Sequence, residues 1–355
     1  MNAVTRTAVL GDLVGDGSDV AELTLRVWHD AYAGKMWYPI WDEAFCRWQL
    51  PAEDRQLHVG AYADDQLVGF FGAVPQSLRI AGRVWPIGVA SWCTVDPEYR
   101  AQALTMRLLQ QLEVRQKEAG LALSLGIVSG DQDSLAYRMW SQYARVFPSK
   151  MRFLSRLGYW AKLLDPSVMA RNGLTSAERL GARAFAPVLG LNFGGADQWR
   201  PYTPDDHVSC ARLLDATTRG FDWSLEWSDA RLARQLEGEG AKTYVLEKEG
   251  GVAAFASVAV MPFVGRAPIP AGVLDLWCMP GYGTPHRVRA LGGLCRQLRG
   301  DGLSLLLALR CAMTPAATFA ATGFLPLPAK DHLAAIFPRD DVPLDPPRTW
   351  SLLFR

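Results

Sequence analysis

The residues from Val95 to Thr105, VDPEYRAQALT, combine side chains that suit phosphate binding. An apolar run ends here and an amphipathic run begins, which is typical of a strand joined to a helix. The first backbone N–H groups of a helix have no partner within it and carry a partial positive charge. Arg100 adds a permanent charge, and Ala101 and Ala103 leave room beside the backbone. The junction predicts a pyrophosphate site, with an ordinary helix start and a solvated arginine as the alternative.

Cys93, in SWCTV just before this junction, is a second candidate for chemistry. As a nucleophile it would form a covalent intermediate. No histidine stands near it in the sequence, so burial as an apolar thiol is the favoured interpretation. The six cysteines form no CxxC pair and the five histidines form no metal-binding spacing. We therefore expect no metal, and reduced thiols in a cytoplasmic protein.

The elements around the junction follow from periodicity and turn signals. In the N-terminal half the sequence predicts a helix over 18–33, capped by Ser18 or Asp19, and then three strands. A second helix is expected to end near Gly120 and to be followed by a central buried strand in LALSLGIVS. A third helix, capped by Asp133 or Ser134, is expected after that strand. The three strands are expected at 57–63, 67–80 and 83–95.

The second half repeats this order of elements. Strands separated by KEGG and GRAP precede the helix HRVRALGGLCRQLRGDG and the buried strand LSLLLALRC, and AATFAATGFLPL predicts a short helix leading into a final hairpin. Trp92-Cys93 falls on Trp277-Cys278, and Arg100 falls on Arg287. We therefore predict a mixed α/β protein built from a duplicated unit. Its domains are expected at 1–165 and 199–355, joined by a connecting helix over 166–198.

The strand–helix junction resembles motif A of the GNAT superfamily of acyl-CoA-dependent N-acyltransferases. The family pattern is (Q/R)-x-x-G-x-(G/A), whereas Arg100 to Thr105 reads RAQALT, with Ala103 for the first glycine. The C-terminal half reads RVRALG from Arg287, and FAATGF at 319–324 resembles the family's closing signature. The resemblance covers both halves and implies two tandem GNAT-like domains.

In this family the first turn of the helix holds the coenzyme A pyrophosphate, and the strand end receives the pantetheine arm. The resemblance implies an acetyl-CoA or other acyl-CoA site in the N-terminal half, whose VDPEYR entry is the better match. The C-terminal half, with MPGYGTPHR at its junction, would be degenerate. The implied cofactor-binding residues are Thr94, Val95, Arg100, Ala101, Gln102, Ala103, Leu104 and Thr105.

The catalytic groups implied by the resemblance are incomplete. Many GNAT enzymes carry a glutamate base on the strand before motif A, and Val89 occupies that position here. Asp275, in VLDLWC, is the nearest carboxylate in the C-terminal half, with a structural strand residue as the alternative. The family's general acid is a tyrosine on the helix after the central strand, and Tyr137 is expected to fill this role.

Composition limits the partners. A net charge of +1 argues against nucleic acid, and no apolar run is long enough to span a membrane. The aromatic segment 29–50 is expected either to line an acceptor pocket or to anchor the first helices.

The function expected is acyl transfer from acyl-CoA to an amine of a small-molecule acceptor, by direct attack in a ternary complex. The alternatives are a non-catalytic acyl-CoA or acyl-carrier binding protein, and an enzyme that acts on a thiol or hydroxyl or decarboxylates a thioester. An acyl carrier protein is a further candidate partner, and the sequence makes no prediction of oligomeric state.

Overall fold

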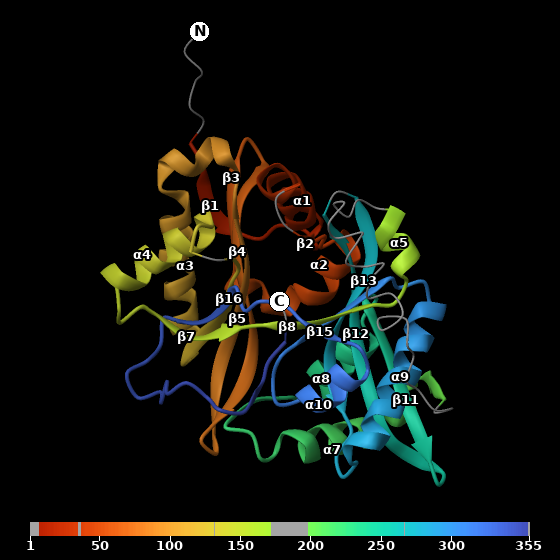
Figure 1. Cartoon of the computed structure of the whole chain (residues 1–355). Coiled ribbons are helices and arrows are strands. Elements are labelled where there is room, and N and C mark those ends of the chain that lie inside the picture. Colours follow the sequence, from red (N-terminus) through yellow and green to blue (C-terminus); the bar gives the residue numbers. More distant parts are fainter. Residues whose placement is uncertain (1–6, 35–36, 131, 172–197, 266, 354–355) are drawn as a thin grey trace.

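The protein consists of two mixed sheets packed side by side, each covered by helices (Figure 1). The computed structural model describes residues 7–34, 37–130, 132–171, 198–265 and 267–353. The described residues thus cover most of both halves. Most of the predicted connecting segment 166–198 lies outside them, and only α5 (Pro166–Arg171) is described there.

The first sheet is built mainly from the N-terminal half. Its main path runs β1 (Val9–Asp12), β3 (His58–Ala63), β4 (Gln66–Ile80), β5 (Arg83–Val95), β6 (Leu123–Val128), β16 (Asp331–Ile336) and β7 (Met151–Leu157). Two short strands, β10 (Trp223–Glu226) and β17 (Trp350–Ser351), extend it beside β4. The strands predicted at 57–63, 67–80 and 83–95 are confirmed to within one residue, and the strand in LALSLGIVS is central as expected.

Four helices accompany this sheet. They are α1 (Ser18–Tyr32), α2 (Glu43–Gln49), α3 (Leu104–Glu118) and α4 (Leu135–Val146). Ser134 caps α4 by accepting a hydrogen bond from the backbone N–H of Tyr137 at 3.1 Å, as one of the two predicted caps. The cap predicted for α1 is wrong, because Gly17 in a left-handed conformation starts that helix without a side-chain cap.

The second sheet repeats the plan. Its main path runs β15 (Leu325–Pro326), β8 (Tyr159–Leu163), β14 (Leu305–Leu309), β13 (Pro268–Cys278), β12 (Gly251–Val264), β11 (Ala241–Lys248) and β9 (Trp199–Pro201), and β2 (Tyr38–Pro39) pairs with β12. Its helices are α7 (His207–Thr218), α8 (Asp229–Glu237), α9 (Thr284–Gly300) and α10 (Ala316–Ala321). The order β11-β12-β13-α9-β14-α10 matches β3-β4-β5-α3-β6-α4, which confirms the predicted repeat.

The two sheets exchange strands. Only Gly158 separates β7 from β8, yet β7 belongs to the first sheet and β8 pairs with β14 in the second. In return β16 from the C-terminal half lies between β6 and β7. The predicted final hairpin is therefore wrong, because β15 and β16 lie in different sheets. The limits 1–165 and 199–355 stay a proposal for the two repeat units.

Candidate active site

The strand–helix junction begins where β5 ends at Val95. A 3-10 turn (η2, Pro97–Gln102) follows, and α3 starts at Leu104. Ala103 between them has φ 52°, in the left-handed region that glycine adopts most readily, which gives a physical reason for the family's glycine at this position. Arg100 folds back, and its Nε donates to the carbonyl of Val95 at 3.3 Å.

The predicted cofactor-binding residues divide into two groups. Three side chains are engaged in the fold: Thr94 Oγ1 accepts from Trp28 Nε1 at 3.1 Å, Gln102 Oε1 accepts from the backbone of Ala8 at 3.0 Å, and Leu104 is fully buried. These residues offer a ligand mainly their backbone. Arg100 is the charged side chain of the group. Burial raises the pKa of the nearby Tyr32, and the positive charge of Arg100 partly offsets this rise.

A gap opens between β5 and β6 next to this junction. The two strands pair in parallel from Ile87 with Leu123 to Ala90 with Gly126, and beyond that point β5 continues along β4 alone. The β5–β4 pairing shifts register between the pairs Phe70–Thr94 and Gly72–Ser91. The shift leaves Trp92 and Cys93 opposite Phe71 as a bulge, with Trp92 at φ 61°.

The gap leads into a large cavity of about 720 Å³. Its wall includes both sides of the gap, the N-terminal end of α4 and residues of the second sheet. Trp37, Tyr38 and Trp41 line it, so part of the aromatic segment 29–50 forms the pocket wall, as one of the two hypotheses held. Phe45 and Trp48 are buried in the core instead, which agrees with the other hypothesis, that the segment anchors the first helices. The second sheet contributes Tyr38, Pro39, Tyr159, Ala161, Leu163, Phe263, Leu305, Leu307 and Leu325.

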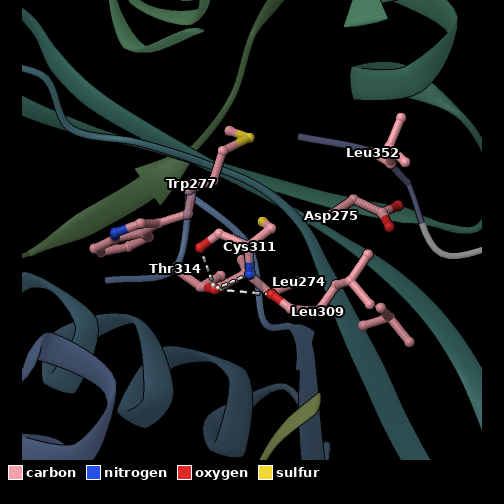
Figure 2. A pocket seen from close by; sticks show the side chains of 9 residues that line it. Leu274, Asp275, Trp277, Leu309, Cys311, Thr314 and Leu352 are labelled. Carbon is pink, nitrogen blue, oxygen red and sulfur yellow. Dashed lines mark hydrogen bonds between the residues drawn. The ribbon is translucent and has the colours of Figure 1, made fainter. Parts of the chain in front are cut away.

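The C-terminal half forms the same gap but fills it. Strands β13 and β14 pair in parallel from Ala271 with Leu305 to Leu274 with Ala308, and the register of β13 then shifts at Asp275. The space beyond holds only about 10 Å³ and is closed by Met313, Thr314 and Leu352, among other residues (Figure 2). Thr314 bonds the backbone carbonyls of Leu309 and Cys311 there, at 2.8 and 3.1 Å.

The arginine predicted in the second half occupies a comparable place. Arg287 lies in the first turn of α9, and its Nη2 donates to the carbonyl of Met279 at 3.3 Å, much as Arg100 does to Val95. The helix α9, with Gly283 and Pro285 at its start, begins before Arg287, whereas α3 begins after Arg100. The two junctions are therefore related but not equivalent.

The predicted catalytic groups lie at different distances from the cavity. Val89 packs in a small apolar pocket, and Asp275 is buried and accepts from Gln235 Nε2 at 3.0 Å. Asp275 lies on the filled gap rather than on the large cavity (Figure 2). Tyr137 is half-buried between Phe153 and His332, at ring distances of 5.6 and 4.6 Å.

The general-acid role of Tyr137 stays a prediction. Its neighbours Ala136 and Trp140 line the cavity, while Tyr137 itself is absent from the described lining. Cys93 does line the cavity, but burial raises the pKa of its thiol to about 12. A thiol with this pKa forms little thiolate near neutral pH, which argues against an acyl-enzyme on Cys93.

Sequence reasoning missed two polar residues on the cavity wall. Tyr159 donates a hydrogen bond to Asp331 Oδ2 at 2.7 Å, and the backbone N–H of Gly130 donates to Asp331 Oδ1 at 3.0 Å. Burial raises the pKa of both side chains. Tyr159 and Asp331 begin the two exchanged strands, so only knowledge of the exchange would have brought them to the site.

The comparisons with known proteins agree with this geometry. Residues 18–130 match a family model described as an acetyltransferase (GNAT) domain. The fold is similar to N-myristoyltransferase from Saccharomyces cerevisiae with bound myristoyl-CoA, at a TM-score of 0.75 and 15% identity, covering 96% of this chain and 84% of that one. It is also similar to a GCN5-related N-acetyltransferase from Kribbella flavida, at a TM-score of 0.51 and 15% identity, covering 94% and 72%. No curated protein sequence gives a significant match.

Residues 18–130 are therefore similar to a GNAT acetyltransferase domain, and the chain as a whole shares its fold with these solved N-acyltransferases. The family match lies on the N-terminal unit, and the tandem fold extends over both units. Within the described residues, no group of three or more histidine, cysteine or acidic side chains is arranged to hold a metal ion. No helix in the described part of the chain is long and apolar enough to cross a membrane.

Proposed function

We propose that the N-terminal unit binds acyl-CoA at the β5–α3 junction and transfers the acyl group to an amine held in the large cavity. The observation that carries this proposal is the contrast between the two gaps. Both units part their central strands beyond a short parallel pairing, but the first gap leads into about 720 Å³ and the second retains about 10 Å³. Only the first gap has room for a thioester and an acceptor.

The phosphates of the coenzyme would lie at the start of α3. The N–H groups of Leu104 and Thr105 point out of the first turn by helix geometry, and Arg100 supplies the cation beside them. The pantetheine arm would extend along the end of β5 at Thr94 and Val95. The thioester would then reach the bulge at Trp92 and Cys93, where the extra residue leaves backbone groups outside the regular ladder.

The chemistry proposed is direct attack in a ternary complex. The neutral amine nitrogen forms the new bond to the thioester carbon and loses one proton to water, the carbon–sulfur bond breaks, and the thiolate takes up one proton and leaves as coenzyme A. Tyr137 remains the proposed proton donor, and Tyr32, which lines the cavity near Arg100, is the competing donor.

The acyl group and the acceptor are both proposals. The N-myristoyltransferase neighbour binds myristoyl-CoA, and the cavity here offers room for an acyl chain longer than acetyl. A small-molecule amine stays the proposed acceptor. The alternatives are binding of acyl-CoA or an acyl carrier without turnover, transfer to a thiol or hydroxyl, and decarboxylation of a thioester.

The test compares the two arginines. Arg100→Glu should weaken coenzyme A binding, measured by calorimetry, because a carboxylate would replace a cation beside the phosphates. Arg287→Glu is the matched control and should change binding much less. If Arg287→Glu abolished binding and Arg100→Glu left it unchanged, the coenzyme would bind the C-terminal half and the proposal would be wrong.

Turnover separates the enzyme from its alternatives. Release of free coenzyme A from acetyl-CoA and myristoyl-CoA should depend on an added primary amine, with the amide detected by mass spectrometry. Tight coenzyme binding without amine-dependent release across the amine panel would favour the non-catalytic alternative. Release without amide formation would favour the hydroxyl, thiol or decarboxylation alternatives.

A further inference from the structure

Asp331 is held in a fixed orientation on the cavity wall. Its Oδ2 accepts from the hydroxyl of Tyr159 at 2.7 Å and its Oδ1 accepts from the backbone N–H of Gly130 at 3.0 Å. Gly130 has φ 102°, and a Cβ there would lie 2.5 Å from Ser134 Oγ, so only glycine suits this position. A carboxylate oxygen has two lone pairs, so each oxygen retains capacity for a further donor.

The surroundings of Asp331 favour a cation. Among the described residues that line the cavity, Asp331 is the one carboxylate, and most of the others are apolar or aromatic. A charge in such surroundings is costly unless it is paired. Lys330, the preceding residue, also lines the cavity and is exposed. The cavity therefore presents one negative and one positive side chain to a ligand that is otherwise apolar.

The strand registers place Asp331 near the bulge. His332 pairs with Val128 in antiparallel fashion, so Asp331 lies level with Ser129. Ala90 pairs with Gly126 in parallel fashion, so three residues further along each strand Cys93 is also level with Ser129. Asp331 and the bulge thus lie at a similar level on the two strands that flank β6, β16 on one side and β5 on the other. Ser129, Cys93 and Asp331 all line the cavity.

We propose that Asp331, oriented by Tyr159 and Gly130, binds the primary amine of an apolar acceptor, and that the acceptor's apolar part fills the aromatic cavity between the two sheets. This inference rests on the proposed function, because it assigns the acceptor end of the same site. It also provides a carboxylate at the cavity, where the strand position occupied by Val89 offers none.

The proposal predicts a selectivity that can be measured without coenzyme A. Decylamine, decanol and decanoate share one apolar chain and differ in the head group. Trp28, Trp37, Trp41, Trp92 and Trp140 line the cavity, so ligand binding should change the tryptophan fluorescence of the full-length protein. Decylamine is expected to bind at least about tenfold more tightly than decanol, the gain from one charge-assisted hydrogen bond at a buried site.

Asp331→Asn should remove this preference while leaving decanol affinity unchanged, which shows that the cavity is intact. Asp340→Asn makes the same change at an exposed position outside the cavity lining and should behave as the unmodified protein. Tyr159→Phe keeps the carboxylate and should retain a preference for the amine.

Each of the following results would overturn the proposal: equal binding of decylamine and decanol, a preference for decylamine that survives Asp331→Asn, or tighter binding of decanoate, which would point to Lys330 instead. Absence of binding by all three probes would also overturn it. The proposed function is tested separately. Amine selectivity without acyl transfer would leave this inference standing and remove the function. Transfer to an amine at the same KM in Asp331→Asn would do the reverse.

Discussion

His58 gives the protein a predictable loss of stability in acid. It lies on β3 with no exposed surface, its ring packs against Phe70 at 6.2 Å, and neither ring nitrogen has a hydrogen-bond partner among the described residues. Burial, reinforced by the positive charges of Arg115 and Arg55, lowers the pKa of His58 from 6.5 to about 4. The folded protein therefore holds this imidazole neutral, whereas the unfolded chain protonates it below about pH 6.5.

The sign and the size of the effect follow from proton linkage. Between pH 6.5 and 4 the unfolded chain binds a proton that the folded chain does not, so stability falls as the pH is lowered through this range. A difference of 2.5 units between the pKa values corresponds to about 3 kcal/mol in total, of which about 2 kcal/mol is lost by pH 5. Above pH 6.5 the contribution of His58 is constant.

His58→Leu tests this reasoning, because leucine has a similar size and does not titrate. The variant should lose the part of the acid-dependent decrease in the free energy of unfolding that His58 causes, measured by urea denaturation at several pH values. His286→Leu, an exposed position on α9, is the control and should change the profile little. The reasoning is refuted if the His58 ring titrates near pH 6.5 by NMR, or if His58→Leu retains the full decrease.

The remaining predictions concern the site. Tyr137→Phe should lower kcat at least about tenfold with coenzyme affinity unchanged, because general acid help is worth roughly 10²–10⁴-fold; full activity in this variant together with a loss in Tyr32→Phe would move the role to Tyr32. Gly130→Ala should weaken amine binding and lower the melting temperature, because its Cβ meets Ser134 and displaces the N–H that orients Asp331; an unchanged melting temperature and amine affinity would contradict this.

The sequence predicts local structure well in this chain. The strands from His58 to Val95 are marked by apolar runs and by the turns ADDQ and AGR, where Asp64, Asp65 and Ala81 adopt positive φ and Gly82 follows Ala81. The repeat is visible because each unit must build the same three-strand, helix and strand order around its own gap. These features depend on contacts between residues close together in the chain.

Strand exchange was not predictable from the same signals. Both β8 and β16 are short, with β8 partly and β16 largely buried, and nothing in a short strand of this kind specifies which of the two sheets it joins. The choice depends on pairings such as β8 with β14 and β16 with β6, between segments far apart in the chain. The hydrogen bond between Tyr159 and Asp331 spans 172 residues, so no local pattern marks it.

The exchange also explains why both units line one cavity. Without β16, strand β6 would lose its neighbour on the side of β7, and the cavity would lose Asp331 and Ile336. Without β8, the second sheet would lose the strand beside β14, and the cavity would lose Tyr159, Ala161 and Leu163.

Each unit therefore completes a wall that the other needs. The junction at Arg100, proposed to bind the coenzyme, lies wholly in the first unit, so all the proposed phosphate contacts come from one unit. The proposed acceptor side requires both units, because Asp331 and many of the apolar lining residues come from exchanged strands and from the second sheet. A filled gap in the second unit is consistent with this division: that unit forms a cavity wall, and its own junction need not admit a ligand.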